Sequence, residues 1–225
     1  AQKGAGRENS FGLNIRLPFE QRANETIHGD KKLINFNYFF TRKVNFVKET
    51  DAFVLFPGGF GTQDEGFECR TLMQTGKAKI TPLVLLDTPD GRYWETWEFF
   101  IKNDLLRMRL ISPTDFHLFK ICHSCDEAVD HVVQFYRVFH SYRWVREMMV
   151  IRINKRLADR SLDVLNDQFR GILVDGRIEQ KEALPEESGE PGIAALPRLV
   201  LTPKKTDFGM LRLLIDTINA SQTQA

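Results

Sequence analysis

The sequence predicts an α/β fold, with a Rossmann-like parallel sheet flanked by helices and a small α+β appendage at the C-terminal end. Two observations support this prediction. Short apolar runs alternate along the chain with amphipathic stretches, which is the pattern of βαβ units. The runs at 52–56 and 82–86 are continuously apolar, which is typical of strands buried on both faces of a parallel sheet.

The first part of the chain is expected to alternate between strands and helices. The expected strands are 11–15, 33–36, 52–56 and 82–86. The expected helices are 38–50, 63–75, 93–109 and 126–149, where apolar side chains recur among polar and charged ones at helical spacing. We therefore assign residues 1–148 to the Rossmann-like domain.

Residues 149–225 differ in pattern and are expected to form the α+β appendage. Its expected strands are 150–153, 171–174 and 198–201, and its expected helices are 156–169 and 208–219. The stretch 182–196 contains two prolines, two glycines and four glutamates. That composition is typical of an exposed loop.

Composition excludes several classes of protein. The chain has 225 residues, of which 42% are hydrophobic and 27% charged, and its net charge is +1. A binder of nucleic-acid polymers usually carries a basic excess, so no such partner is expected. No apolar run approaches the roughly 18 residues of a membrane span, so no membrane partner is expected. The three cysteines, Cys69, Cys122 and Cys125, do not indicate a disulfide framework, and a cytoplasmic location is expected.

The strongest motif is the loop Pro57-Gly58-Gly59-Phe60-Gly61-Thr62, which follows an expected buried strand and precedes an expected helix. Glycines permit positive φ and let a ligand approach the backbone. Thr62 is the expected N-cap of the helix, with Glu65 completing a capping box. Free N–H groups at such a helix start bind anions, and ligands of open α/β sheets bind at the carboxyl ends of the strands.

Each of these features also has a purely structural interpretation. The glycines could serve only a tight strand-to-helix turn. Glu65 and Glu68, one turn apart, could be surface carboxylates. Arg42 and Lys43 could form a solvated helix face, although an Arg beside an anion site offers a planar fork for phosphate.

Two of these motifs together resemble a known family. The segment 39–43, Phe-Phe-Thr-Arg-Lys, resembles its M-x-x-R-K element, with Phe39 in place of Met. The segment 57–65 matches its P-G-G-x-G-T-x-x-E element at every fixed position. Residues 12–21 resemble the stretch that precedes these motifs in longer members. The chain is similar in this way to the LOG family, labelled "possible lysine decarboxylase" in older descriptions, over about residues 1–135.

The resemblance implies hydrolysis of the N-glycosidic bond of a nucleoside 5′-monophosphate to a free base and ribose 5-phosphate, without metal or cofactor. Arg42 and Glu65 would be the catalytic pair. The phosphate-binding and substrate-binding residues implied are Gly58, Gly59, Gly61, Thr62, Lys43 and Glu68. Members are typically dimers, so a homodimer or higher homo-oligomer is expected. Lysine decarboxylation would need pyridoxal phosphate on a Schiff-base lysine, and no lysine here is marked for that role.

Family members carry an earlier half-domain with another glycine-rich loop, and this chain opens on Ala1 without it. We therefore expect that an N-terminal part is missing from the sequence, or that the chain is not active alone. This leaves two other functions open: a nucleotide-binding sensor that does not cleave its ligand, and a structural subunit that pairs with a complete homologue.

Two further signals receive a structural interpretation. Cys122 and Cys125 have C-x-x-C spacing, but a zinc site would need a second ligand pair, which the remaining histidines do not offer. A loop after a strand is the expected role of this segment. The aromatic cluster at 93–100 and the segment 134–144 are expected to be packing helices.

Overall fold

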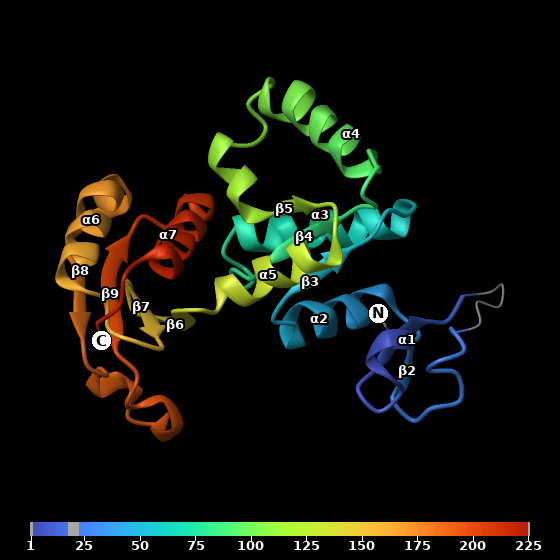
Figure 1. Ribbon diagram of the computed structural model, residues 1–225, viewed down its shortest axis with the longest axis horizontal. Coiled ribbons are helices and arrows are strands. Elements are labelled where there is room, and N and C mark those ends of the chain that lie inside the picture. Colours follow the sequence, from blue (N-terminus) through green and yellow to red (C-terminus); the bar gives the residue numbers. More distant parts are fainter. Residues whose placement is uncertain (1, 18–22, 225) are drawn as a thin grey trace. The chain divides into compact units, whose positions relative to one another are not determined.

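The computed structural model describes residues 2–17 and 23–224. It divides into two compact units, 1–51 and 52–225, and each is described by itself. Figure 1 shows the secondary structure of both.

The first unit contains a pair of parallel strands and a helix that follows them. Its elements are α1 (Gln2–Ala5), β1 (Gly12–Ile15), β2 (Leu33–Phe36) and α2 (Phe39–Glu49). Strand β1 pairs with β2 from Gly12 opposite Leu33 to Ile15 opposite Phe36. The two strands and α2 confirm the sequence-based expectations for this region. Residues 18–21 of the stretch compared with longer family members lie outside the described residues.

The second unit opens with a parallel sheet of order β3-β4-β5. Its strands are β3 (Phe53–Leu55), β4 (Leu83–Leu86) and β5 (Lys120–Cys122). Its helices are α3 (Phe60–Gln74), α4 (Tyr93–Phe100), the π-helical segment η1 (Ile101–Leu106), the 3-10 helix η2 (Pro113–Leu118) and α5 (Cys125–Phe135). Central β4 is buried throughout, as its continuous apolar run predicts. Strand β3 is buried only at Phe53, so full burial was wrong for it.

The rest of the second unit is built on an antiparallel sheet of order β6-β7-β9-β8. Its strands are β6 (Phe139–Val145), β7 (Met148–Ile153), β8 (Leu173–Lys181) and β9 (Arg198–Pro203). Its helices are α6 (Asp159–Phe169) and α7 (Phe208–Ala220), with 3-10 turns at Arg170–Ile172, Pro185–Glu187 and Pro191–Ile193. The sheet begins before residue 149, and the division at 148/149 stays a prediction.

The prediction of a helix over 126–149 is confirmed only as far as Phe135 and is wrong for the residues after it. Helix α5 ends at Phe135, and Phe139 begins strand β6, which pairs with β7. The aromatic residues of this segment favour a strand, and pairing with β7 outweighs its weak helical spacing. The backbone N–H groups of Val138 and Phe139 both donate to Asn219 Oδ1 at 2.9 Å, which turns the chain out of α5.

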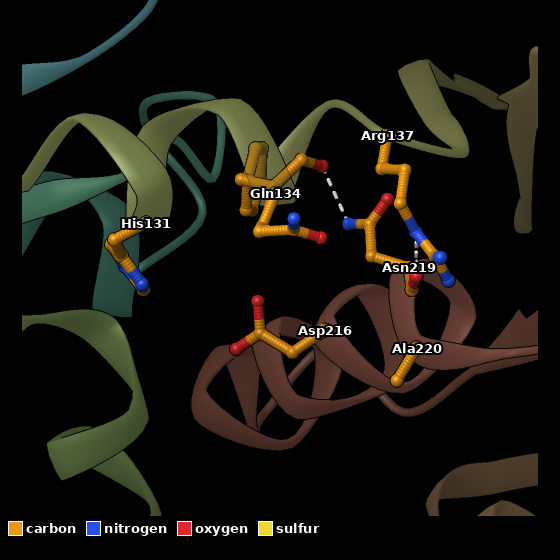
Figure 2. A pocket seen from close by; sticks show the side chains of 7 residues that line it. His131, Gln134, Arg137, Asp216, Asn219 and Ala220 are labelled. Carbon is orange, nitrogen blue, oxygen red and sulfur yellow. Dashed lines mark hydrogen bonds between the residues drawn. The ribbon is translucent and has the colours of Figure 1, made fainter. Parts of the chain in front are cut away.

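Helix α7 joins the parallel and antiparallel parts of the second unit. One buried core contains Ile80 and Phe135 together with the apolar side chains of β7, β9 and α7. Figure 2 shows Asn219 of α7 beside the end of α5, where its Nδ2 donates to the Phe135 carbonyl at 2.5 Å. Arg137 Nε donates to the Asn219 carbonyl at 2.6 Å. Because these contacts share one core, the appendage packs firmly on the end of α5.

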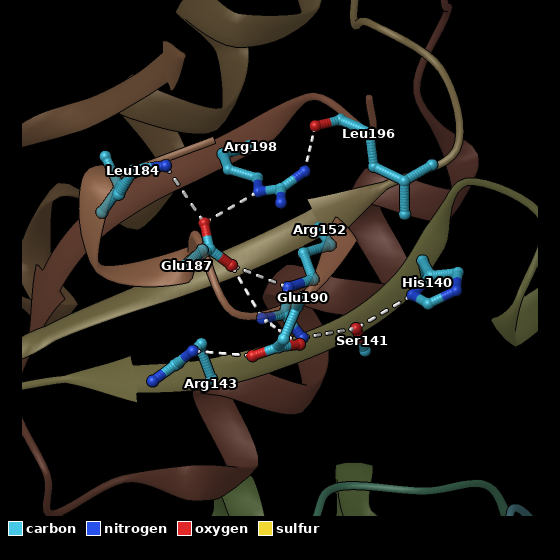
Figure 3. A network of polar contacts seen from close by, with 9 residues as sticks. All are labelled: His140, Ser141, Arg143, Arg152, Leu184, Glu187, Glu190, Leu196 and Arg198. Atoms are coloured by element: carbon cyan, nitrogen blue, oxygen red, sulfur yellow. Dashed lines mark hydrogen bonds and ion pairs between the residues drawn. The ribbon is translucent and has the colours of Figure 1, made fainter. Parts of the chain in front are cut away.

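The loop expected at 182–196 is not uniformly exposed. Glu187, in its first 3-10 turn, is only 2% exposed. Figure 3 shows its carboxylate between Arg152 of β7 and Arg198 of β9. Glu187 accepts hydrogen bonds from Arg152 Nε at 2.8 Å and from Arg198 Nε at 2.9 Å. The expectation of an exposed loop was therefore wrong at this residue, because two cations from the sheet offset its desolvation.

Candidate functional site

A cavity of about 390 Å³ lies at the carboxyl ends of the three parallel strands. Its walls are residues 56–57 after β3, 86–89 at the end of β4, and 123–125 after β5. Parallel pairing places these ends at the same edge, with Leu55 opposite Leu85 and Leu86 opposite Cys122. Open α/β sheets bind their ligands at this edge.

Phe56 and Pro57 form one wall of this cavity, and the glycine-rich turn that continues from Pro57 leads directly into α3. The helix begins at Phe60, and Gly59 is its N-cap, with φ −84° and no side-chain capping bond. The predicted capping box of Thr62 and Glu65 was therefore wrong, since Thr62 already lies in the first helical turn. Its N–H donates to the Gly59 carbonyl at 3.1 Å. Phe60 is 95% exposed beside the loop.

The three loop glycines do not need positive φ, contrary to the sequence-based expectation. None of them is among the positive-φ glycines of the described residues. The three positions differ in how much room they leave for a side chain, which the contacts of an added Cβ show. At Gly58 it would lie 2.2 Å from Thr62 Oγ1 and 3.0 Å from Thr62 Cβ. At Gly59 and Gly61 it would meet nothing within 4 Å. Gly58 thus serves close packing of the turn, whereas Gly59 and Gly61 leave open space against the backbone.

Tyr93, at the start of α4, holds the loop in place. Its hydroxyl donates to the Gly58 carbonyl at 2.5 Å and accepts from Gln63 Nε2 at 2.5 Å. It therefore connects the turn, the first turns of α3 and the start of α4. Sequence reasoning placed Tyr93 in a packing helix and missed this role, because no local pattern marks a contact between residues 35 apart.

Asp87 builds the second wall, directly after β4. Its buried carboxylate accepts hydrogen bonds from Thr88 N at 2.9 Å and Trp94 N at 3.3 Å. An added Cβ at Gly91 would lie 2.0 Å from Asp87 Oδ1, so the turn has no room for a side chain there. Trp94 Nε1 donates to the Leu86 carbonyl at 3.2 Å, which fixes α4 on the end of β4.

The third wall is the Cys122-to-Cys125 segment, which sequence analysis treated only as a loop after a strand. That placement is confirmed, and the loop also lines the cavity. Ser124 Oγ accepts from Glu127 N at 3.2 Å and caps α5, so a second helix begins at this edge. His123 Nδ1 lies 3.3 Å from the Thr88 carbonyl. Burial raises the pKa of the Cys122 thiol to about 11, whereas Cys125 is exposed.

The predicted site residues fall into the two units. Gly58, Gly59, Gly61 and Thr62 come together in one turn, and Glu65 and Glu68 follow on α3, both half-buried. Arg42 and Lys43 lie on α2 of the first unit.

The Arg42 guanidinium on α2 lies over two aromatic rings of its own helix. Its carbon is 5.8 Å from the Phe39 centroid and 5.7 Å from the Phe46 centroid. The family's usual Met is replaced here by Phe39, and the ring offers the guanidinium an aromatic face.

Among residues 2–17 and 23–224, no group of three or more His, Cys, Asp or Glu side chains could hold a metal ion. No helix there is both long enough and apolar enough to cross a membrane.

The fold and the site define a Rossmann-like α/β protein with a glycine-rich strand-to-helix loop at the carboxyl edge of its parallel sheet. The sequence profile of the family described as "Possible lysine decarboxylase" matches residues 1–132. The chain therefore belongs to this family, the LOG family, and is of the LOG enzyme type. A comparison with curated proteins found no significant match.

Proposed function

We propose that this protein hydrolyses the N-glycosidic bond of nucleoside 5′-monophosphates. Water adds to C1′ of the ribose, the C1′–N bond breaks, and the base leaves with a proton, which yields ribose 5-phosphate. The observation that carries the proposal is the loop from Pro57 to Thr62, which fills the family's fixed positions and opens a helix at the carboxyl edge of the sheet. Bonds of this kind break most easily through an oxocarbenium-like transition state.

The 5′-phosphate is assigned to the start of α3. The first N–H groups of a helix have no partners within it, and the helix dipole adds positive potential. Gly59 and Gly61 leave the backbone accessible there, and Thr62 adds a hydroxyl. Holding the phosphate would orient the sugar for attack at C1′.

The remaining predicted residues take the chemical roles. Glu65 lies one turn after Gly61, where its carboxylate can stabilise the cationic ribose or activate water. Glu68 would help hold the ribose or the water. Arg42 would anchor the phosphate or steady the leaving base, and Lys43 would add positive charge for the phosphate.

Assembly and location belong to the same proposal. Because family resemblance implies dimers with the site near the subunit interface, we propose a homodimer or higher homo-oligomer. The exposed Phe56 and Phe60 beside the loop would then contact either the base or a second copy. A cytoplasmic setting supplies the nucleotide substrates.

Gly61→Ala should weaken phosphate binding without reducing the stability of the fold. Beyond its chain neighbours and the backbone of its own helix, a Cβ there meets nothing within 4 Å, and alanine replaces glycine inside α3, so the unfolding temperature should stay unchanged or rise. The Cβ covers the backbone N–H groups, and losing a charge-assisted hydrogen bond should weaken AMP binding by roughly tenfold or more. Adenosine, which lacks the phosphate, should bind both proteins equally. Calorimetric titration measures both affinities.

Gly171→Ala is the matched control, because an added Cβ there also meets nothing within 4 Å and lies far along the chain from the loop. It should leave AMP binding unchanged. Unchanged AMP affinity in Gly61→Ala would contradict the assignment of the phosphate to this loop.

A further inference from the structure

A second cavity, of about 160 Å³, lies against α3 in the second unit. It is formed by α3, α4, η1, η2 and Phe119, the residue just before β5. Arg70 and Gln74 contribute from the C-terminal half of α3. This cavity shares no lining residue with the cavity at the carboxyl edge of the parallel sheet.

Arg70 is the unusual feature of this cavity. The residue is 9% exposed. Its guanidinium carbon lies 4.1 Å from the Trp97 ring centroid and 4.9 Å from that of Phe67. Among the described residues, no group accepts a hydrogen bond from its Nε, Nη1 or Nη2. A buried guanidinium without hydrogen-bond acceptors is costly, so it signals a missing acceptor.

The other polar groups of the cavity point to the same chemistry. Trp97 Nε1 is also buried without an acceptor in the described chain. Asp115, the acidic residue of the lining, already accepts from Gln74 Nε2 at 2.6 Å and from Ser112 N at 2.8 Å. Burial lowers the pKa of Arg70 to about 10, so the guanidinium stays charged at neutral pH. The atoms of this lining without a hydrogen-bond partner, on Arg70 and Trp97, are therefore all donors. An anionic acceptor would satisfy them and balance the charge of Arg70.

The rest of the lining is apolar and shaped by an unusual backbone. Ile101 and Leu105 come from the π-helical segment η1, a conformation that is rare and often found at functional sites. With Phe67, Phe116 and Phe119, they surround the space next to Arg70. An engineered cavity of about 150 Å³ holds benzene, so this volume fits a single small ring.

We propose that this cavity is a binding site for a small planar carboxylate with an apolar body. The carboxylate would accept from the fork of Arg70 and from Trp97 Nε1, and the apolar body would lie among the aromatic and aliphatic side chains. The proposal does not depend on the reaction at the carboxyl edge. A ligand here would contact the same helix that carries Glu65.

Benzoate is the probe, and benzamide is its neutral counterpart of the same size. Calorimetric titration of the whole chain should show saturable benzoate binding in the millimolar range or tighter. Benzamide should bind at least roughly tenfold more weakly, because it lacks the charge that pairs with Arg70. Chloride and inorganic phosphate should compete poorly, because they leave the apolar lining unfilled.

Arg70→Met keeps an unbranched apolar stem at this position and removes the charged guanidinium. Without ligand, its unfolding temperature should equal or exceed that of the native chain, because an unpaired buried cation is gone. Its benzoate affinity should fall at least roughly tenfold. Retained benzoate binding in Arg70→Met would overturn the proposal, as would equal binding of benzamide or no saturable binding by the native chain.

Two further results would also overturn it. Equal affinity for phosphate and benzoate would show a general anion site. A change of sedimenting mass in Arg70→Met, with no probe bound by the native chain, would show that a second copy fills the cavity. If Arg70→Met fails to fold, the comparison of benzoate with benzamide on the native chain decides the question. Base release plays no part in these outcomes.

Discussion

Glu65→Gln should lower kcat for base release from AMP by about 10²- to 10⁴-fold, the range expected for loss of a positioned acid–base group. Glutamine keeps the shape and hydrogen-bonding reach of the side chain but cannot carry the negative charge that stabilises a cationic ribose. AMP affinity should change little, because the phosphate is assigned to the start of α3. Initial rates and a titration on the same preparation measure both quantities.

Asp64→Asn is the matched control for Glu65→Gln. It removes one carboxylate from the same turn of α3, and Asp64 is exposed. Its rate should remain close to that of the native chain. Full activity in Glu65→Gln would contradict the role of Glu65, and equal losses in both variants would show a general effect of charge.

Glu187→Gln should reduce the free energy of unfolding by about 3–5 kcal/mol, the usual effect of breaking a buried ion pair. The side chains of Glu187 and Arg198 are fully buried, and that of Arg152 is 7% exposed. Removing the carboxylate charge takes from Arg198 the carboxylate that it contacts in this network and leaves Arg152 with the more exposed Glu190 (Figure 3). Urea unfolding followed by circular dichroism measures the change.

Glu190→Gln is the control for Glu187→Gln. Glu190 contacts Arg143 at 2.7 Å and Arg152 at 2.9 Å, but its side chain is 40% exposed. Its loss should cost less than about 1 kcal/mol, because exposed ion pairs contribute little. Equal effects of the two substitutions would contradict the buried network as the source of stability.

The same network predicts an acid-sensitive stability. Burial raises the pKa of Glu187, but hydrogen bonds from Arg198 and Arg152 outweigh it and hold the pKa below its usual 4.5. The ionised carboxylate therefore contributes its full stability above about pH 4.5, and this is lost as the pH falls through the lower folded-state value. Glu187→Gln should lack this part of the acid dependence.

The features that sequence predicted well are local. The continuous apolar run of β4, the helical spacing of α2 and the order of glycines at 57–62 each depend on neighbouring residues, so the parallel sheet, its helices and the family could be read without the structure. The Thr62 capping box was wrong because the helix begins at Phe60, three residues before the expected start at 63, and its N-cap is Gly59.

The features that sequence missed depend on distant contacts. Tyr93 meets Gly58 only after α4 has packed at the end of β4. Glu187 looks like part of an exposed acidic loop until Arg152 and Arg198 are brought beside it by pairing of β7 and β9. In the sequence, Arg70 is an ordinary charged residue of an amphipathic helix. Only the folded chain places the Trp97 ring against its guanidinium. Such pairings leave no periodic signal in the chain.

The proposed reaction breaks the bond between the base and the ribose phosphate. The most direct test is a time course of free-base release from AMP, GMP, CMP, UMP and a cytokinin riboside monophosphate, with ribose 5-phosphate measured in the same samples. We expect equimolar base and ribose 5-phosphate from at least one nucleotide, and loss of both products in Glu65→Ala. Bound nucleotide that remains intact after prolonged incubation would contradict it and indicate a sensor that holds its ligand without cleaving it.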